Sequence, residues 1–409
     1  MKTNVAVFFG GRSVEHEISV ISALQAINAL DRAKYDIVPI YISKQGRWYT
    51  GDNLLNVNNY RNLDTLVSNA VEVYMRPVYG DYNLYEARHS GGLFSSKAPK
   101  VVAELHVALP VLHGTNGEDG IFEGVLETIG IPFAGCNTLS SANGMDKITM
   151  KMILREEGIP VVDYVWFTDK QWISDRDAMV ARVEEKLGYP VIVKPANLGS
   201  SVGIGKASDR AELIEKINDA EQFSRRIIVE HMVEKLKEIN CSVLGDADDH
   251  QSSVCEEPIK TGDFLSYSDK YMGGSGMQSS DKRIPAQIPE ETSERIRKMA
   301  ADTFRVLSCH GVSRIDVMID EADGNIYVNE INTIPGSLSF YLWEATGISF
   351  SELMDRLVQL ALQRKREADR KTFTYDQNIF AMGGGTKGGS KGGAKGGFFG
   401  AKGAKSGGR

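Results

Sequence analysis

The sequence predicts an α/β protein of two or three domains, and three observations support this prediction. The chain has 409 residues, more than one ordinary domain contains. Near the N-terminus, the apolar run 4–9 (NVAVFF) ends at a Gly-Gly turn and leads into apolar residues at helical spacing over 18–27. Toward the C-terminus, the apolar stretches 314–319 and 325–331 flank Asp323-Gly324, a dipeptide typical of a hairpin turn.

The overall composition is that of a globular protein without a membrane span. No apolar run is long enough to cross a bilayer, and no signal peptide opens the chain. The net charge of −7 argues against nucleic-acid or membrane binding by the folded body. The four cysteines lack metal-ligand spacing, and we expect free, buried thiols in a reducing cytoplasm: Cys136, Cys241, Cys255 and Cys309.

The end of the chain differs from the rest. Residues 383–409 carry five lysines, one arginine and no acid among many glycines, a composition that cannot bury enough apolar surface to fold. We expect a disordered, solvated tail or an appended segment. The alternative is a weak anchor for polyanions, with Phe398-Phe399 as its apolar contact.

The turn after the first strand is Gly-rich but lacks the later glycines of a dinucleotide-binding fingerprint. Ser13 is placed to cap the helix that follows. Glu15 and Glu17 lie in the first turn of this helix, and two interpretations remain. They stabilise the helix dipole, or they face a ligand cleft at the carboxyl end of the strand.

Further elements are predicted as strands over 36–43, 107–112 and 131–133 and a helix over 121–129. Residues 44–100 are polar, rich in tyrosine and weakly periodic, so we expect a loose surface insert. The strand over 107–112 ends in HGTNGEDG, which gathers His113, Glu118 and Asp119. A lone histidine after a strand is usually structural, and the Gly-rich loop makes a ligand-facing role the alternative.

The central part contains an amphipathic helix and a candidate phosphate cradle. The helix lies in MDKITMKMILREEGIPV and ends before Gly158. In the segment YPVIVKPANLGSSVGIGKA, the Gly/Ser loop 199–203 offers N–H groups that can approach phosphate closely, and Lys194 offers a cation. This is not a Walker A loop, and a plain hairpin tip is the alternative. Strands follow over 225–230 and from Glu238.

Polar side chains share faces on the predicted C-terminal hairpin. Because residues two apart on a strand point the same way, Arg314 and Asp316 share one face, as do Glu330 and Asn332 on the partner strand. Carboxylate and amide oxygens are ligands that suit Mg²⁺, which takes few protein ligands beside substrate phosphates. The alternative is a surface hairpin with solvated charges and an Arg–Asp pair.

Eight motifs occur in an order that resembles the D-alanine–D-alanine ligases of the ATP-grasp superfamily: GGRSVEHEIS, HGTNGEDG, MDK, VIVKPANLGSSVGI, IIVE, DKY, RIDV and NEINTIPG. The resemblance covers about residues 3–368. It implies a three-domain ATP-grasp fold with an N-terminal Rossmann-like domain, and ATP bound between the sheets of the other two domains. The implied divisions are an N-terminal substrate domain, a central subdomain, a C-terminal subdomain with the metal site and a disordered tail: 1–138, 139–240, 241–375 and 376–409.

The resemblance also implies an ATP site. Lys147 and Lys194 correspond to the lysines that hold the phosphates, and Ser200 and Ser201 lie in the loop that covers the γ-phosphate. Glu238 corresponds to the carboxylate on the ribose, although it lies one residue later than in some relatives. The remaining implied contacts are an adenine-facing segment and a lysine further along the chain: Glu230, His231, Val233 and Lys270.

The implied metal ligands are those of the hairpin. Asp316, Glu330 and Asn332 correspond to the ligands of two Mg²⁺ ions, with Mn²⁺ as a substitute. Arg314 corresponds to the arginine that stabilises the transferring groups, and the backbone N–H of Gly336 to an oxyanion donor.

The implied substrates are ATP and two molecules of D-alanine. Glu15 corresponds to the carboxylate that pairs with the ammonium of the first D-alanine, and His113 lies near that substrate. Glu15, Ser200 and Tyr271 correspond to a hydrogen-bonded group that links the N-terminal domain to a closing loop. In the implied reaction, the first D-alanine is phosphorylated on its carboxylate, and the amine of the second attacks the resulting acyl phosphate.

Two segments depart from the family pattern. The segment 262–285 around Tyr271 is long and rich in Gly and Ser, so we expect a mobile lid. After Pro335, the sequence SLSFYLWE stands where many relatives have a Ser-Leu pair that binds the second substrate, so Ser337, Tyr341 and Leu342 are expected there. The retained pair Lys270-Tyr271 favours D-alanine over D-lactate as second substrate.

Three alternatives remain for the function: a ligase that joins D-alanine to D-serine or D-lactate, a small-molecule kinase on the same nucleotide site, and a non-catalytic binding protein. The last requires lost metal ligands, whereas Asp316, Glu330 and Asn332 are all present. Because relatives are usually homodimers, the resemblance also implies a homodimer.

Overall fold

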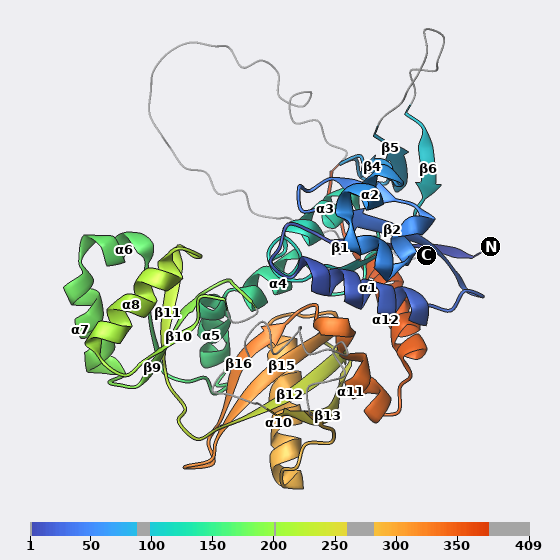
Figure 1. Ribbon diagram of the computed structural model, residues 1–409. Coiled ribbons are helices and arrows are strands. Elements are labelled where there is room, and N and C mark those ends of the chain that lie inside the picture. The colour runs from blue at the N-terminus through green and yellow to red at the C-terminus, as the bar shows by residue number, and fades with distance from the viewer. Residues whose placement is uncertain (1, 88–98, 200–201, 260–281, 376–409) are drawn as a thin grey trace, which may run out of the picture. The chain divides into compact units, whose positions relative to one another are not determined.

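The computed structural model describes residues 2–87, 99–199, 202–259 and 282–375. The chain divides into two compact units, Met1–Ala368 and Asp369–Arg409. All described helices and strands lie in the first unit (Figure 1). The described part of the second unit, 369–375, contains no helix or strand. The predicted lid 262–285 falls largely, and the predicted tail entirely, outside the described residues.

The first sheet contains seven strands in the order β6-β5-β4-β3-β2-β1-β7. Its strands are β1 Thr3–Gly10, β2 Tyr35–Ile42, β3 Trp48–Thr50, β4 Val71–Met75, β5 Asn83–Glu86, β6 Val101–Glu104 and β7 Val107–Val111. The associated helices are α1 His16–Ala29, η1 Asp52–Leu55, η2 Val57–Arg61, α2 Leu63–Ser68, α3 Ile121–Ile129 and α4 Thr138–Met145. Strand β1 runs parallel to both β2 and β7, so the carboxyl ends of these strands meet at one edge. This confirms the predicted strand–helix unit and the helix over 121–129.

Three local predictions in this region are wrong. The insert 44–100 is not a loose surface segment, because β3, β4 and β5 extend the sheet and Leu54 is fully buried. These strands have three to five residues, too few to show a periodicity. Ser13 does not cap α1, because Glu15 is the N-cap residue. The Ser13 hydroxyl instead accepts a hydrogen bond from the backbone N–H of Glu15. Over 131–133, only Phe133 pairs, in an isolated bridge to Ala108.

The second sheet has four strands in the order β10-β9-β11-β8, and all its pairs are antiparallel. Its strands are β8 Tyr164–Thr168, β9 Val191–Pro195, β10 Gly205–Ala207 and β11 Arg226–His231. The helices in this region are α5 Lys147–Glu156, α6 Asp169–Ser174, α7 Arg176–Lys186 and α8 Arg210–Glu221. A buried apolar cluster joins α6, α7 and α8 to the sheet, and the rings of Phe167 and Trp172 stack within it.

The third sheet has five strands in the order β14-β13-β12-β15-β16, again antiparallel. Its strands are β12 Leu236–Gly245, β13 His250–Pro258, β14 Lys282–Arg283, β15 Gly311–Asp320 and β16 Ile326–Asn332. The helices in this region are α10 Glu290–Val306, η4 Gly336–Ser339, α11 Phe340–Ala345 and α12 Phe350–Ala368. Helix α10 lies against this sheet (Figure 1), whereas α12 shares an apolar cluster with α1 and β1.

All four cysteines are free and buried, as predicted. None of the described helices combines the length and the apolar character that a membrane crossing requires.

Candidate active site

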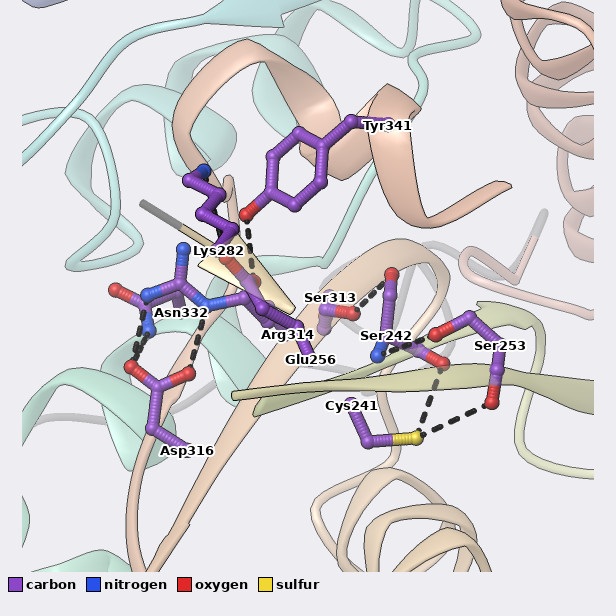
Figure 2. Close-up of polar contacts among 10 residues, drawn as sticks. All are labelled: Cys241, Ser242, Ser253, Glu256, Lys282, Ser313, Arg314, Asp316, Asn332 and Tyr341. Atoms are coloured by element: carbon purple, nitrogen blue, oxygen red, sulfur yellow. Dashed lines mark hydrogen bonds and ion pairs between the residues drawn. The ribbon is translucent and has the colours of Figure 1, made fainter. Parts of the chain in front are cut away.

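Four polar residues meet on the paired strands β15 and β16. Arg314 lies opposite Asn332, and Asp316 lies opposite Glu330. The Arg314 guanidinium donates two hydrogen bonds to the Asp316 carboxylate, Nε to Oδ1 at 2.6 Å and Nη2 to Oδ2 at 2.8 Å. The Asn332 amide donates to Asp316 Oδ2 at 3.1 Å (Figure 2). The predicted gathering of these side chains on one face is therefore present, and so is the Arg–Asp pair of the alternative interpretation.

The charges around Asp316 fit a bound cation. Burial raises the pKa of Asp316, the Arg314 guanidinium lowers it, and the carboxylates of Glu330 and Glu238 raise it again. A divalent cation would relieve this repulsion between carboxylates. Among the described residues, no three His, Cys, Asp or Glu side chains form a metal cluster. The set Asp316, Glu330 and Asn332 supplies two carboxylates and one amide oxygen, which suits Mg²⁺ only when substrate phosphates complete the coordination.

The predicted phosphate lysines lie beside these carboxylates. Lys147 begins helix α5, and its Nζ is 3.1 Å from Oε2 of Glu330. Lys194 comes from β9, and its Nζ donates to Glu230 Oε2 at 2.7 Å and to Asn329 Oδ1 at 3.1 Å. Helix α5 and strand β9 thus bring two ammonium groups to the edge of the candidate metal site on the third sheet. A triphosphate is the kind of ligand that this combination of charges fits.

Sequence reasoning missed a third lysine of this cluster. Lys151 in α5 is completely buried, and its Nζ lies 3.2 Å from Oε1 of Glu230. Burial alone would raise the pKa of Glu230, but the ammonium groups of Lys151 and Lys194 lower it to about 2. Lys147 and Lys151 are four residues apart on one helix, so this spacing was the signal that could have identified Lys151.

The Gly-rich loops of the first sheet contact the segment that follows β16. Glu118 accepts hydrogen bonds from the N–H of Gly114 at 2.9 Å and of Ile334 at 3.1 Å. Burial raises the pKa of Glu118 to about 8, and the nearby Glu15 carboxylate adds to this shift. Gly114 has φ +71°, and a Cβ there would lie 2.5 Å from Oε2 of Glu15. Glycine is therefore required where the loop passes Glu15.

Glu15 also lies near the Gly/Ser loop of the second sheet, because a Cβ added at Gly199 would lie 3.1 Å from its Oε2. This places the predicted ammonium-binding carboxylate beside the predicted γ-phosphate loop. The partners proposed for it in that loop and in the lid, Ser200 and Tyr271, fall outside the described residues. The same holds for Ser201 and Lys270.

His113 is buried in a network that joins two parts of the chain. Its Nε2 lies 2.9 Å from the Ser22 hydroxyl of α1, and this hydroxyl accepts a hydrogen bond from the Ser337 N–H at 2.9 Å. Burial lowers the pKa of His113 to about 4, and the Arg314 charge adds to this effect. The side chain is therefore neutral at pH 7 and is suited to hydrogen bonding near a substrate.

The buried histidine predicts a loss of stability in acid. The folded pKa of about 4 is below the unfolded value of about 6.5, so the unfolded state binds more protons as the pH falls through this window. The stabilisation is complete above pH 6.5 and is lost toward pH 4. We expect the stability of His113→Gln to depend less on pH than that of the wild type. The difference in unfolding free energy between the wild type and this variant is expected to shrink by about 2 kcal/mol between pH 7 and pH 5. Denaturant unfolding at both pH values tests this, and an unchanged deficit would contradict it.

The predicted second-substrate segment adopts an unusual backbone. Ser337, Leu338 and Ser339 have φ values of +49°, +54° and +51°, so three consecutive non-glycine residues are left-handed. Such a conformation costs about 1–2 kcal/mol per residue. Contacts that hold it include hydrogen bonds to α1, from the Ser337 N–H to Ser22 and from the Ser337 hydroxyl to Gln25, and the burial of Leu338 in the core shared with α1.

Tyr341, which follows this turn in helix α11, points toward the hairpin site. Its hydroxyl donates to Glu256 Oε2 at 3.0 Å, and Lys282 Nζ lies 3.9 Å from the centre of its ring (Figure 2). Burial and the Glu256 carboxylate raise the pKa of Tyr341, so it remains a neutral hydroxyl. Leu342, by contrast, is fully buried, so its side chain offers less to a substrate than that of Tyr341.

The left-handed turn predicts a stabilising substitution. Ser339 is fully buried, and its hydroxyl has no hydrogen-bond partner among the described residues. Ser339→Gly removes both the strain and this hydroxyl, whereas Ser339→Ala removes the hydroxyl alone. We expect the glycine variant to exceed the alanine variant in unfolding free energy by about 1 kcal/mol. Equal stabilities in denaturant titration would show that the turn is not strained.

The remaining predicted ATP contacts come from β11, the segment after it, and β12. His231 ends β11 with an exposed side chain, and Val233 is buried against Val162 and Met318. Glu238 lies in β12 opposite Met318, and its charge acts on Asp316. Gly336 follows Pro335 at the start of η4. The roles of these residues stay predictions.

Comparisons with known proteins agree with this arrangement. The family described as D-ala D-ala ligase N-terminus matches residues 4–136, and the one described as D-ala D-ala ligase C-terminus matches residues 153–359. The chain is 40% identical to a D-alanine–D-alanine ligase of Thermosipho melanesiensis over 92% of this chain and 98% of that protein.

Solved structures give the same result. The D-alanine–D-alanine ligase of Coxiella burnetii superposes with a TM-score of 0.74 at 29% identity, over 90% of this chain and 96% of that one. VanG, a D-Ala:D-Ser ligase of Enterococcus faecalis, has a TM-score of 0.74 at 31% identity, over 88% of this chain and 100% of that one. The expected ATP-grasp fold is confirmed, and the chain belongs to the D-alanine–D-alanine ligase family.

Proposed function

We propose that this protein is an ATP-dependent D-alanine–D-alanine ligase that makes the dipeptide for peptidoglycan precursors. The observation that carries the proposal is the convergence of cations and carboxylates at one place. Lys147 lies 3.1 Å from Glu330, Glu330 lies opposite Asp316 on the paired strands, and Lys194 contacts the same strand through Asn329. A nucleoside triphosphate with a divalent cation fits both sets of charges, because its phosphates pair with the lysines and the cation pairs with the carboxylates.

The proposed reaction has two steps. The carboxylate of the first D-alanine attacks the γ-phosphorus of ATP, the bond to the β-phosphate oxygen breaks, and an acyl phosphate and ADP form. The amine of the second D-alanine then attacks the acyl carbon, and phosphate leaves from the tetrahedral intermediate. Both steps depend mainly on positioning and charge neutralisation.

Different residues of this chain provide the positioning and the charge neutralisation. Lys147 and Lys194 hold the phosphates, and Arg314 neutralises charge that develops on the transferring groups. Glu15 binds the ammonium of the first D-alanine. The neutral His113 supports this substrate from the buried side, where its ring is fixed by Ser22.

Asp316, Glu330 and Asn332 would hold Mg²⁺, or Mn²⁺ in its place, which when bound neutralises the phosphate oxygens. We also propose a cytoplasmic location and a homodimer. The four free, buried cysteines fit a reducing compartment, and the homodimer rests on the family alone.

A second candidate function concerns the second substrate. VanG, which acts as a D-Ala:D-Ser ligase, is as similar in structure as the D-alanine–D-alanine ligase of Coxiella burnetii. Tyr341, one of the residues proposed for the second substrate, contacts Glu256, which also pairs with Lys282, and a serine hydroxyl would fit such a polar set. D-Serine is therefore the alternative to D-alanine as second substrate.

A coupled assay for ADP release tests the proposed function. We expect ATP consumption to depend on D-alanine and to produce ADP and phosphate in equal amounts. Adding D-serine or D-lactate beside a low concentration of D-alanine reveals the alternative second substrates. An absence of D-alanine-dependent ADP release would reject the ligase, and ADP without free phosphate would favour a kinase.

A further inference from the structure

Lys151 is a buried cation that the proposed reaction leaves without a role. It lies in the middle of helix α5, four residues after Lys147, and its side chain is fully buried. A buried ammonium group is unfavourable unless an anion compensates it. Within the described part of the chain, its one ion-pair partner is Glu230, with Nζ 3.2 Å from Oε1. A leucine or methionine would fill the space at lower cost, so the charge requires an explanation.

Glu230 is shared between two lysines. Its Oε2 accepts a hydrogen bond from Lys194 at 2.7 Å, while its Oε1 faces Lys151, and its side chain is 2% exposed. A single buried carboxylate therefore has two cations, one more than it needs for neutrality. The two lysines differ in their surroundings, because Lys194 also reaches Asn329 of β16 beside the candidate metal site.

The surplus cation matters when a nucleotide binds. Lys194 is the proposed phosphate lysine, and a phosphate oxygen competes with Glu230 for its ammonium group. If Lys194 were the sole partner of Glu230, its departure would leave a buried carboxylate uncompensated, which is strongly unfavourable. The Lys151 side chain is fully buried, so we expect it to stay beside Glu230 and not to move to the phosphates when a nucleotide binds.

We propose that Lys151 is a positioning residue for the nucleotide: it keeps Glu230 compensated and in place, and so lets Lys194 turn from Glu230 to the phosphates of ATP. This inference rests on the proposed function, since it takes Lys194 and Glu230 as nucleotide contacts. The electrostatics agree with it. Burial lowers the pKa of Lys151 to about 8, and the Glu230 carboxylate raises it, so the charge of Lys151 depends on Glu230.

The substitution Lys151→Met tests this, because methionine has a similar length and no charge. With Lys194 then bound more firmly to Glu230, we expect the Kd and the KM for ATP to rise about tenfold, with kcat changed less than about threefold. Adenosine carries no phosphate and is expected to bind with unchanged affinity. The control Lys170→Met, at an exposed position of α6, is expected to match the wild type. An equal loss of affinity for adenosine and ATP, or a loss confined to kcat, would overturn the proposal.

A double variant separates a charge effect from a packing effect. In Lys151→Met/Glu230→Gln, the carboxylate that needs compensation is gone, so we expect ATP to bind no more weakly than to Glu230→Gln alone. Additive losses would show that Lys151 acts through packing and would overturn the proposal. If Lys151→Met alone does not fold, the double variant is expected to fold as stably as Glu230→Gln, and an unfolded double variant would contradict us.

The outcome is also distinguishable from failure of the proposed function. ATP and adenosine binding are measured by calorimetry without D-alanine. A wild type that binds ATP but releases no ADP with D-alanine would reject the ligase and leave the binding test of Lys151 intact.

Discussion

Replacement of Glu330 by alanine is expected to lower kcat for D-alanine-dependent ADP release by at least about a thousandfold. Glu330 supplies one of the two carboxylates of the candidate metal site and also pairs with Lys147 at 3.1 Å. Its loss would remove a ligand of the proposed cation and would leave the Lys147 ammonium group without this partner. Both defects act on the phosphates, where nearly all the catalytic stabilisation of phosphoryl transfer is located.

The fold is expected to survive this change. The Glu330 side chain is 26% exposed, and the neighbouring core residues of β16, Val328 and Ile331, are unchanged. Circular dichroism and thermal unfolding verify this, and Glu185→Ala, at an exposed position of α7, controls for the loss of a carboxylate elsewhere. Activity within tenfold of the wild type in folded Glu330→Ala would reject the metal assignment.

Arg314→Lys is expected to reduce kcat about 100- to 1000-fold while the KM for ATP changes only a few-fold. Arginine donates through Nε and Nη2 to both oxygens of Asp316, a planar geometry that a lysine ammonium group cannot reproduce. In the proposed site, Lys147 and Lys194 hold the nucleotide, so its binding is expected to persist. The defect therefore falls on the transferring groups.

A matched control shows whether the effect is local. Arg305→Lys makes the same exchange at an exposed position in the last turn of α10 and is expected to leave kcat unchanged. Steady-state kinetics of both variants with ATP and D-alanine provide the comparison. If Arg314→Lys raised the KM for ATP and left kcat intact, the arginine would be a binding residue, and its proposed role would be wrong.

The sequence predicted those elements whose local signals are strong. The helix over 121–129 was predicted with its observed ends, and the structure shows that Gly120 and Gly130 flank it. The faces of β15 and β16 followed from the two-residue period of a strand, and the structure places Arg314 and Asp316 opposite Asn332 and Glu330. The order of the family motifs then connected this hairpin with the two lysines.

Other features depend on contacts that a linear pattern does not contain. The strands β3 to β5 are too short to show alternation, and they form because a neighbouring strand is available. The left-handed turn at 337–339 opposes the local preference of serine and leucine, and it is held by contacts with α1. Lys151 shares a helix face with Lys147, but its pairing with Glu230 of β11 exists only in the folded chain.

The product formed from ATP and a mixture of D-alanine, D-serine and D-lactate tests the central claim most directly. Mass spectrometry of the reaction is expected to show D-alanyl-D-alanine as the main product, formed in equal amount with ADP and phosphate. A dominant D-alanyl-D-serine would keep the chemistry and change the second substrate. A stable phosphorylated product without any dipeptide, or no product at all from a folded protein that binds ATP, would contradict the ligase.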